Sequence, residues 1–347
     1  KKPLILGIES SCDETAASLI TENEEGFPVV LSNIVSSQVE VHREFGGVVP
    51  ELAARSHIEK IDWIVKKAID ESGRKIEEID AVASTAGPGL IVCLSVGLSF
   101  GKAFATAMNK PFIAVNHLEG HALSPKLNTN LNYPYLLLLI SGGHSQYLSV
   151  QNLGKYKRLG TTIDDALGEA FDKTAKLLGI EFPGGPQIEI LAKKGDPEKY
   201  DLPKPIFSKG GCNLSFAGLK TAVLKISKTI KSEQDKYDLA ASFQKTIEEI
   251  LYKKTKIAFT EFEKINELNE KIFVVAGGVA ANKKIRSMLI NLCEENNYKS
   301  IFPPIEFCGD NAAMIAMVGL EKFKINQFNN LDYPAKPRWP LDEDAAF

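Results

Sequence analysis

Two histidines four residues apart are the side chains whose type and spacing most directly suggest chemistry. His117 and His121 fall one turn apart on one face of a helix, for which Asn116 is a suitable N-cap. Imidazoles placed in this way can share one metal ion, although solvated or capping histidines are the alternative. Glu119 stands two residues after the first histidine, whereas zinc proteases carry the glutamate directly after it. Two ligands are too few, so a metal site requires a third, an Asp or Glu, from elsewhere in the chain.

The composition is that of an ordinary globular protein. The chain has 347 residues, enough for two domains, with 44% hydrophobic and 24% charged residues. A net charge of -3 gives no global signature for nucleic acid, which leaves a local basic patch as the alternative. Five scattered cysteines without a C-x-x-C motif favour reduced thiols in a cytosol-like compartment. No signal peptide is visible, and the longest apolar run, at 136–140, is too short to span a bilayer, so no membrane association is expected.

Two stretches repeat one pattern of strand, small polar turn and strand. They are residues 4–20, with an acidic turn at 9–15, and residues 135–150, with a glycine-rich turn at 141–145. A turn of this kind can offer amides and hydroxyls to a phosphate or a metal-bound phosphate, and a plain polar hairpin is the alternative. The repetition indicates an internal duplication. Two halves that each begin in this way are typical of the actin, Hsp70 and sugar-kinase superfamily.

Hydrophobic periodicity places the remaining elements. We expect helices at 51–72, 91–108, 164–178, 218–230, 238–265 and 312–319, strands at 79–84, 111–115, 271–275 and 301–302, and loops at 39–50 and 201–217. His57 lies on the apolar face of the first helix and is interpreted as a satisfied, partly buried histidine. The lysines at positions 220, 225, 228, 231, 253, 254 and 256 are interpreted as solvated helix faces, with a binding patch as the alternative.

Seven motifs occur in an order that resembles one family. They are GIESSCDET (7–15), NHLEGH (116–121), SGGH (141–144), GEAFDK (168–173), PGGP (183–186), AGGVAAN (276–282) and CGDN (308–311). Together they resemble the TsaD (YgjD, Kae/Qri-type) family of tRNA N6-adenosine threonylcarbamoyltransferases, formerly described as O-sialoglycoproteases. The bacterial or organellar type is the most similar, because the chain has no fused kinase.

The resemblance implies a fold and a domain division. The fold is α/β, a two-lobed actin-like ATPase (Hsp70/sugar kinase) fold with duplicated ribonuclease-H-like domains around a central cleft. Residues 1–115 with about 318–347 would form the N-terminal lobe, and residues 116–317 the C-terminal lobe. The metal and nucleotide site would lie in the cleft between the lobes.

The resemblance also implies site residues. His117, His121 and Asp310 would bind one metal ion, so that Asp310 is the third ligand. The site for threonylcarbamoyl-adenylate would be lined by Leu139, Ile140, Ser141, Gly142, Gly143, Asp172, Gly185 and Asn282. Glu189 is a further candidate, as the carboxylate that would bind the ribose of the adenylate. Asp13, in the acidic turn, is the candidate that accepts a proton or places the attacking amine. His144 is a second polar candidate for a role in the reaction.

The implied activity is transfer of the threonylcarbamoyl group from its adenylate to N6 of the adenosine next to the anticodon of ANN-reading tRNAs, with release of AMP. A metalloprotease and a small-molecule kinase of the same fold are the alternative enzymes, and a non-catalytic nucleotide-binding scaffold is the third alternative. Two histidines and a carboxylate suit iron or zinc equally. The expected partners are tRNA, a TsaB-type paralogue, a TsaE-type ATPase and a TsaC-type synthase that supplies the adenylate. The expected location is the cytoplasm, or the mitochondrial matrix in a eukaryote.

Overall fold

The computed structural model describes residues 2–345, and the chain divides into two compact units. Unit 1 contains the residues up to Leu131 and those from Pro303 onward, and unit 2 is Asn132–Phe302. The boundaries expected from the sequence, at 115/116 and about 317/318, differ from these. The histidine helix belongs to unit 1 because it packs against the last helix of the chain, which unit 1 also contains.

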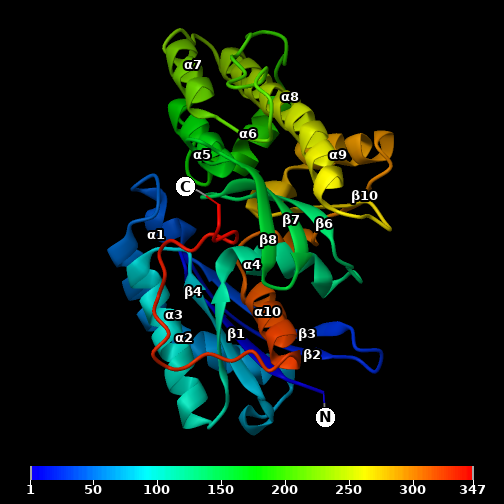
Figure 1. The fold of residues 1–347 in the computed structure, drawn as a ribbon. Helices are drawn as coiled ribbons and strands as arrows, with labels where there is room; N and C mark the ends of the chain where they lie inside the picture. The colour runs from blue at the N-terminus through cyan, green and yellow to red at the C-terminus, as the bar shows by residue number, and fades with distance from the viewer. Residues whose placement is uncertain (1, 346–347) are drawn as a thin grey trace. The chain divides into compact units, whose positions relative to one another are not determined.

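Unit 1 is built on a five-stranded sheet in the order β3-β2-β1-β4-β5 (Figure 1). β1 pairs antiparallel with β2 and parallel with β4, while the outer pairs are antiparallel β2–β3 and parallel β4–β5. The strands are β1 (Ile5–Glu9), β2 (Glu14–Glu22), β3 (Pro28–Ser37), β4 (Ala81–Gly87) and β5 (Phe112–Asn116). All five residues of β1 are buried, as a central strand covered on both faces requires.

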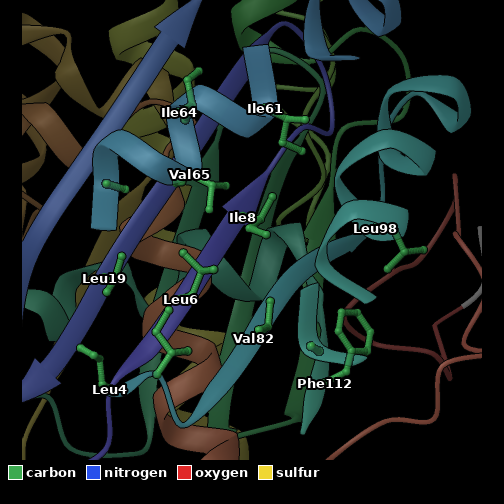
Figure 2. Packing of buried hydrophobic residues seen from close by; sticks show 14 of the residues in the cluster. Leu4, Leu6, Ile8, Leu19, Ile61, Ile64, Val65, Val82, Leu98 and Phe112 are labelled. Carbon is green, nitrogen blue, oxygen red and sulfur yellow. The ribbon is translucent and has the colours of Figure 1, made fainter. Parts of the chain in front are cut away.

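Helices cover both faces of this sheet. They are α1 (Val39–Arg43), α2 (Pro50–Ser72), α3 (Ile91–Ala107), α4 (His117–Leu123) and α10 (Ala312–Lys324), with 3₁₀ turns η1 (Ile76–Glu78), η2 (Ser124–Leu127) and η4 (Ile305–Phe307). Leu6 and Ile8 of β1 pack in one apolar cluster with residues of α2 and α3 (Figure 2). Gly7 points the other way, because strand side chains alternate, and a Cβ there would lie 2.5 Å from the Ala312 carbonyl oxygen. The glycine therefore lets α10 pack closely on the opposite face.

Unit 2 repeats the same sheet. Its order is β10-β9-β6-β7-β8, and its pairs have the same directions, since β6 is antiparallel to β7 and parallel to β9. The strands are β6 (Tyr135–Ile140), β7 (Ser145–Asn152), β8 (Lys155–Thr161), β9 (Ile272–Ala276) and β10 (Lys299–Ile301). The helices are α5 (Leu167–Leu177), α6 (Gly184–Ala192), α7 (Ala217–Ser227), α8 (Glu233–Ile265) and α9 (Lys283–Glu295), with the 3₁₀ turn η3 (Gly278–Ala281). The internal duplication expected from the two hairpins is therefore present.

Several local expectations were wrong. The third strand of each unit, β3 and β8, was not predicted, and residues 39–43 form a short helix rather than loop. The helix expected from 164 begins at Leu167, while the turn at 183–186 opens α6. Within residues 2–345, no helix has the length and apolar character needed to cross a membrane.

Candidate active site

The histidine helix α4 begins where β5 ends, and its start is fixed by the predicted N-cap. The side-chain oxygen of Asn116 accepts a hydrogen bond from the Leu118 amide at 2.9 Å, and its side-chain nitrogen donates to the Trp339 carbonyl at 3.0 Å. Every residue of α4 is buried, including His117 and His121. Buried imidazoles require polar partners, so their surroundings indicate what they bind.

Both imidazoles face the carboxylate of Asp310. Oδ1 of Asp310 lies 3.0 Å from Nε2 of His121 and 3.4 Å from Nε2 of His117. The candidate ligand atoms of these three residues all lie within 4.8 Å of one another. Asp310 comes just before Asn311, the N-cap of α10, whose side chain accepts from the Met314 amide. Thus α4 and the segment just before α10 bring the three side chains together within unit 1, although His121 and Asp310 are 189 residues apart in sequence.

The three residues fit a divalent metal ion. Both rings turn Nε2 toward Asp310, so Nε2 is the atom that each would offer to an ion there. Nδ1 of His121 is buried and has no hydrogen-bond partner among residues 2–345. Burial opposes the charged form of His117, but Asp310 and Glu9 outweigh it and raise the pKa of this imidazole well above its usual value. Burial likewise favours neutral Asp310, yet His117 and His121 hold its pKa well below its usual range. The carboxylates thus require a positive charge at this place, which a cation would supply.

Glu9 is a buried carboxylate that the sequence analysis did not single out. It ends β1 and accepts hydrogen bonds from His117 Nδ1 at 3.0 Å, the Thr85 hydroxyl at 2.6 Å and the Ser11 amide at 2.5 Å. Burial opposes its ionisation, but His117 outweighs burial and lowers the pKa of Glu9. An ionised carboxylate can only accept, so Nδ1 of His117 carries a proton, and Nε2 is the ring atom whose lone pair a metal ion beside Asp310 could bind.

Glu9→Gln should weaken metal binding about 10–100-fold, because it removes the charge that orients His117 and makes the ring a stronger ligand. The measurement is a competition titration with a chelator of known affinity. Thr85→Val is the matched control, since it removes one donor to Glu9 and leaves the Glu9–His117 bond in place. Equal metal affinity in Glu9→Gln and wild type would contradict this role.

The acidic turn between β1 and β2 adds two carboxyl groups to the same region. Asp13 is 8% exposed, and Glu14 beside it is also mostly shielded. Burial, followed by the charges of Asp310 and Asp13, raises the pKa of Glu14 well above its usual value, which favours its protonated form. Burial and the neighbouring carboxylates also raise the pKa of the Cys12 thiol, which excludes this cysteine as a thiolate nucleophile at neutral pH.

Glu119 faces away from the metal ligands. Its carboxylate pairs with the Lys322 ammonium at 2.9 Å, and the two side chains are 4% and 9% exposed. The same ammonium lies 3.5 Å from the Ala114 carbonyl oxygen, in the strand that leads to α4. The pair joins α4 to the last turn of α10, so Glu119 supports the histidine helix and is not placed as a base beside a metal-bound water.

Lys322→Met should destabilise the chain by about 3–5 kcal/mol, because it leaves the Glu119 carboxylate buried without its cation. Replacing both residues by Met should recover most of this loss, because no buried charge then remains. The free energy of unfolding in urea measures both effects. Lys66→Met, at an exposed pair with Asp70, should cost under about 0.5 kcal/mol as the control. A loss for Lys322→Met no larger than this control would contradict the assignment.

His57 is a satisfied buried histidine, as its place on the helix indicated. Its Nδ1 lies 2.7 Å from the Thr15 hydroxyl, and its Nε2 lies 2.9 Å from the Cys12 carbonyl oxygen. Burial lowers the pKa of His57, so the ring is neutral at physiological pH and donates from Nε2 to the carbonyl. It is not part of the metal cluster.

In unit 2, the first group of expected substrate residues lies at the carboxyl end of β6. Leu139 and Ile140 are fully buried strand residues, and the turn Ser141–Gly142–Gly143 follows them. The Ser141 amide donates to the His144 carbonyl at 2.8 Å, and the Gly168 amide donates to the Ser141 carbonyl at 3.1 Å, which ties the turn to the start of α5. A Cβ at Gly142 or Gly143 would meet no atom within 4 Å, so these two positions are open to an approaching group.

The other expected residues follow from α5 to α9. The Asp172 carboxylate accepts from the Gly184 amide at 2.8 Å and so holds the turn that contains Gly185. Asn282 is the N-cap of α9, where its side-chain oxygen accepts from the amides of Lys284 and Ile285. Its side-chain nitrogen donates to Gln244 at 3.0 Å. The structure thus gives Asp172 and Asn282 structural bonds of their own, which any test of ligand binding must separate.

One further bond links these helices. The Glu189 carboxylate of α6 accepts from the Lys283 amide at the first residue of α9, at 3.0 Å. The turn after β6, the start of α5, α6 and the start of α9 are therefore connected within unit 2. Ligands of α/β sheets bind outside the carboxyl ends of such parallel strands.

Comparison with known proteins shows the relationship of the chain. The family model of TsaD, tRNA N6-adenosine threonylcarbamoyltransferase, matches residues 29–317. A protein of that name from Pelagibacter ubique (strain HTCC1062) is 81% identical over 347 residues, covering 100% of this chain and 97% of the relative. A second, from Rickettsia conorii (strain ATCC VR-613 / Malish 7), is 54% identical over 342 residues, with 98% of each chain covered.

A solved structure supports the fold. The crystal structure of T. kodakarensis HypF is similar with a TM-score of 0.62 at 14% identity, over 95% of this chain and 49% of that chain. This likeness concerns the fold alone and confirms the expected actin-like ATPase fold, which the duplicated sheets also have. With a family match over most of its length and relatives at these identities, the chain belongs to the tRNA N6-adenosine threonylcarbamoyltransferase family.

Proposed function

We propose that this chain transfers the threonylcarbamoyl group of threonylcarbamoyl-adenylate to N6 of the adenosine beside the anticodon of ANN-reading tRNAs. The support is the 81% and 54% identity, over nearly complete lengths, to enzymes named for this transfer. The chain is an acyltransferase that modifies tRNA. The observation that carries the proposal to individual residues is the convergence of His117, His121 and Asp310, with Glu9 behind His117.

One divalent metal ion is the proposed cofactor, held by His117, His121 and Asp310. Three protein ligands leave coordination positions open, and this ligand set suits iron or zinc. When bound, the ion supplies Lewis-acid polarisation of an oxygen of the adenylate, on its threonyl carboxylate or its phosphate. Glu9 keeps His117 in the tautomer that presents Nε2, which is the contribution of this buried carboxylate to the site.

The proposed transfer has one bond formed and one broken. N6 of the adenosine attacks the carbamoyl carbon, and the bond from that carbon to the phosphate oxygen breaks, so that AMP leaves with the electron pair. Asp13 accepts the proton that N6 loses, because an exocyclic amine is a weak nucleophile that gains from a positioned base. The residues that bind the adenylate are those of unit 2: Leu139, Ile140, Ser141, Gly142, Gly143, Asp172, Gly185 and Asn282.

The activity is tested by reconstitution. The purified chain is incubated with an ANN-reading tRNA, threonine, bicarbonate and ATP, together with a TsaC-type synthase, a TsaB-type paralogue and a TsaE-type ATPase as proposed partners. Threonylcarbamoyladenosine in the digested tRNA, dependent on this chain, is the expected result. Unmodified tRNA alongside cleaved glycoprotein or a phosphorylated small molecule would overturn it in favour of a protease or a kinase. The pairing of Glu119 with Lys322 already removes the helix carboxylate that a zinc protease would use.

Asn282→Ser should weaken AMP binding by more than twofold while costing less stability than Asn282→Ala. Serine retains the oxygen that caps α9, so the cap survives, but it lacks the amide group proposed to contact the nucleotide. Asn282→Ala removes both the capping oxygen and the amide nitrogen, and it should also cost about 1 kcal/mol of stability. Isothermal titration with AMP measures the affinities. Affinity of Asn282→Ser within twofold of wild type would leave Asn282 with its structural bonds, to the start of α9 and to Gln244.

The cytoplasm is the proposed location. Cys12, Cys93, Cys212, Cys293 and Cys308 are all free thiols in the structure. Reduced cysteines are usual in a reducing compartment, where tRNA is also found. Fluorescent tagging at the chain end, with fractionation of the source cells, tests this location.

A further inference from the structure

One segment of unit 2 carries a charge unlike that of the rest of the chain. Residues 204–231 contain six lysines and no Asp or Glu, in a chain whose net charge is -3, so the remaining residues sum to -9 (-3 minus 6). The segment lies between Asp201 and Glu233, and it comprises the loop before α7, all of α7 and the connection to α8 (Figure 1). A local concentration of this kind attracts polyanions.

Most of these lysines have no acidic partner. Lys220 pairs with Asp165 at 3.0 Å, and Lys204 pairs with Glu249 at 2.5 Å. The other four are exposed and form no ion pair among residues 2–345: Lys209, Lys225, Lys228 and Lys231. Lys225 lies in the last turn of α7, Lys228 is the C-cap residue that follows it, and Lys231 lies in the connection to α8. Three exposed lysines therefore fall within seven consecutive residues.

The other lysine-rich helices of this chain differ. In α8, Lys236 pairs with Glu233 and Lys264 with Glu261, each one turn away along the helix, and α2 pairs Lys67 with Glu71. Such pairs are typical of a solvated helix face, where opposite charges alternate. No acidic residue of α7 is available to do the same. If Lys225, Lys228 and Lys231 were only solvated, no neighbouring acidic side chain would offset the repulsion between their charges.

The loop before α7 is anchored by hydrogen bonds from α8 and has open space around Gly210. Lys254 of α8 is fully buried, and its ammonium donates to the carbonyl oxygens of Lys209 at 2.9 Å and Gly211 at 3.1 Å. Lys253 lies 4.0 Å above the ring of Phe207, in the same loop. A Cβ at Gly210 would meet no atom within 4 Å, so internal packing does not require glycine there. A position without a side chain instead allows the backbone of a ligand to come close.

We infer that residues 204–231 form a surface of unit 2 that contacts the phosphate backbone of the tRNA substrate. The inference rests on the proposed tRNA-modifying function, which supplies a polyanion of the required kind. Lys209, Lys225, Lys228 and Lys231 bind phosphates, while the loop tip at Gly210 lies against the sugar–phosphate chain. Contacts of this kind position the tRNA without reading its sequence.

The test compares two triple variants in the reconstituted modification assay. Lys225→Gln/Lys228→Gln/Lys231→Gln should raise the KM for tRNA at least tenfold and leave kcat within twofold. The slope of log KM against log salt should fall by about 2–3, because each lost phosphate contact removes about 0.7–0.9. The matched control is Lys264→Gln/Lys271→Gln/Lys299→Gln, which removes the same charge from paired lysines of unit 2 and should change KM less than twofold. Equal KM values for the two triple variants would overturn the inference.

A second variant tests the loop tip. Gly210→Glu has room for its side chain, so its melting temperature should match that of wild type, while its carboxylate should raise the KM for tRNA at least fivefold. An unchanged KM would exclude the loop from the surface. Binding to anionic lipid vesicles is measured for wild type and for Lys225→Gln/Lys228→Gln/Lys231→Gln. If the triple variant loses vesicle binding but keeps a normal KM for tRNA, the surface belongs to a membrane and the inference is overturned. Absence of modification by the wild type would contradict the proposed function itself, and so the two failures are distinguishable.

Discussion

Asp13→Asn should lower the rate of tRNA modification by about 10²–10⁴-fold, the range for loss of a general acid–base group. The substitution preserves the shape of the side chain and removes the charge that accepts the proton of N6. Adenylate binding should stay near that of wild type, because the proposed nucleotide residues belong to unit 2. Single-turnover modification with the partner proteins present measures the effect on the chemical step.

The structure sharpens what this variant does to stability. Asp13 belongs to the polar turn between two strands, but it is buried beside Glu14, in the region of Asp310. Removing one of several neighbouring negative charges relieves repulsion, so the melting temperature of Asp13→Asn should equal or exceed that of wild type. Glu14→Gln is the matched control, since the raised pKa of Glu14 favours the protonated form, which Gln resembles. A normal rate for Asp13→Asn, or an equal loss in Glu14→Gln, would refute the assignment of Asp13.

His121→Ala should abolish stoichiometric metal binding and lower the modification rate by at least about 10³-fold, since a Lewis acid contributes several kcal/mol to stabilising charge in a transition state. Two remaining ligands cannot hold the ion in competition with a chelator. Elemental analysis of protein purified with and without chelator gives the metal content. The variant His57→Gln serves as control, because His57 is equally buried in unit 1 and its partners among residues 2–345 are Thr15, Cys12 and Gln38. Full metal occupancy in His121→Ala would exclude the proposed ligand set.

The local features of the site could be predicted where neighbouring residues determine them. The spacing of His117 and His121 and the N-cap at Asn116 depend on a single turn of helix, and the structure confirms that helix and its cap. The missing carboxylate could be anticipated by chemistry, but its identity as Asp310 came from the family resemblance. The strands of the two hairpins were also recognisable, because each is a run of apolar residues beside a polar turn.

The contacts that the sequence did not reveal join distant residues or depend on the tertiary environment. Glu9 looks like one more acid in a polar turn, and only the fold brings it to His117, 108 residues away. Lys322 resembles a solvated lysine at a helix end until α10 packs on the histidine helix. Asp164 lies just before α5 in sequence, yet it accepts from the amides of Phe216 and Ala217 at the start of α7. Strands β3 and β8 are partly exposed, so their periodicity is weaker than that of central strands.

The return of the chain from unit 2 to unit 1 determines when the metal centre can exist during synthesis. His121 and Asp310 are 189 residues apart, so a ribosome that adds about 5–20 residues per second delivers the carboxylate about 10–40 s after the imidazole. Through that interval the face of β1 that receives α10 at Gly7 is uncovered, and the histidines lack their third ligand. A nascent chain therefore acquires a three-ligand metal site only after the whole of unit 2 has been translated, and a product truncated before Asp310 holds an incomplete one.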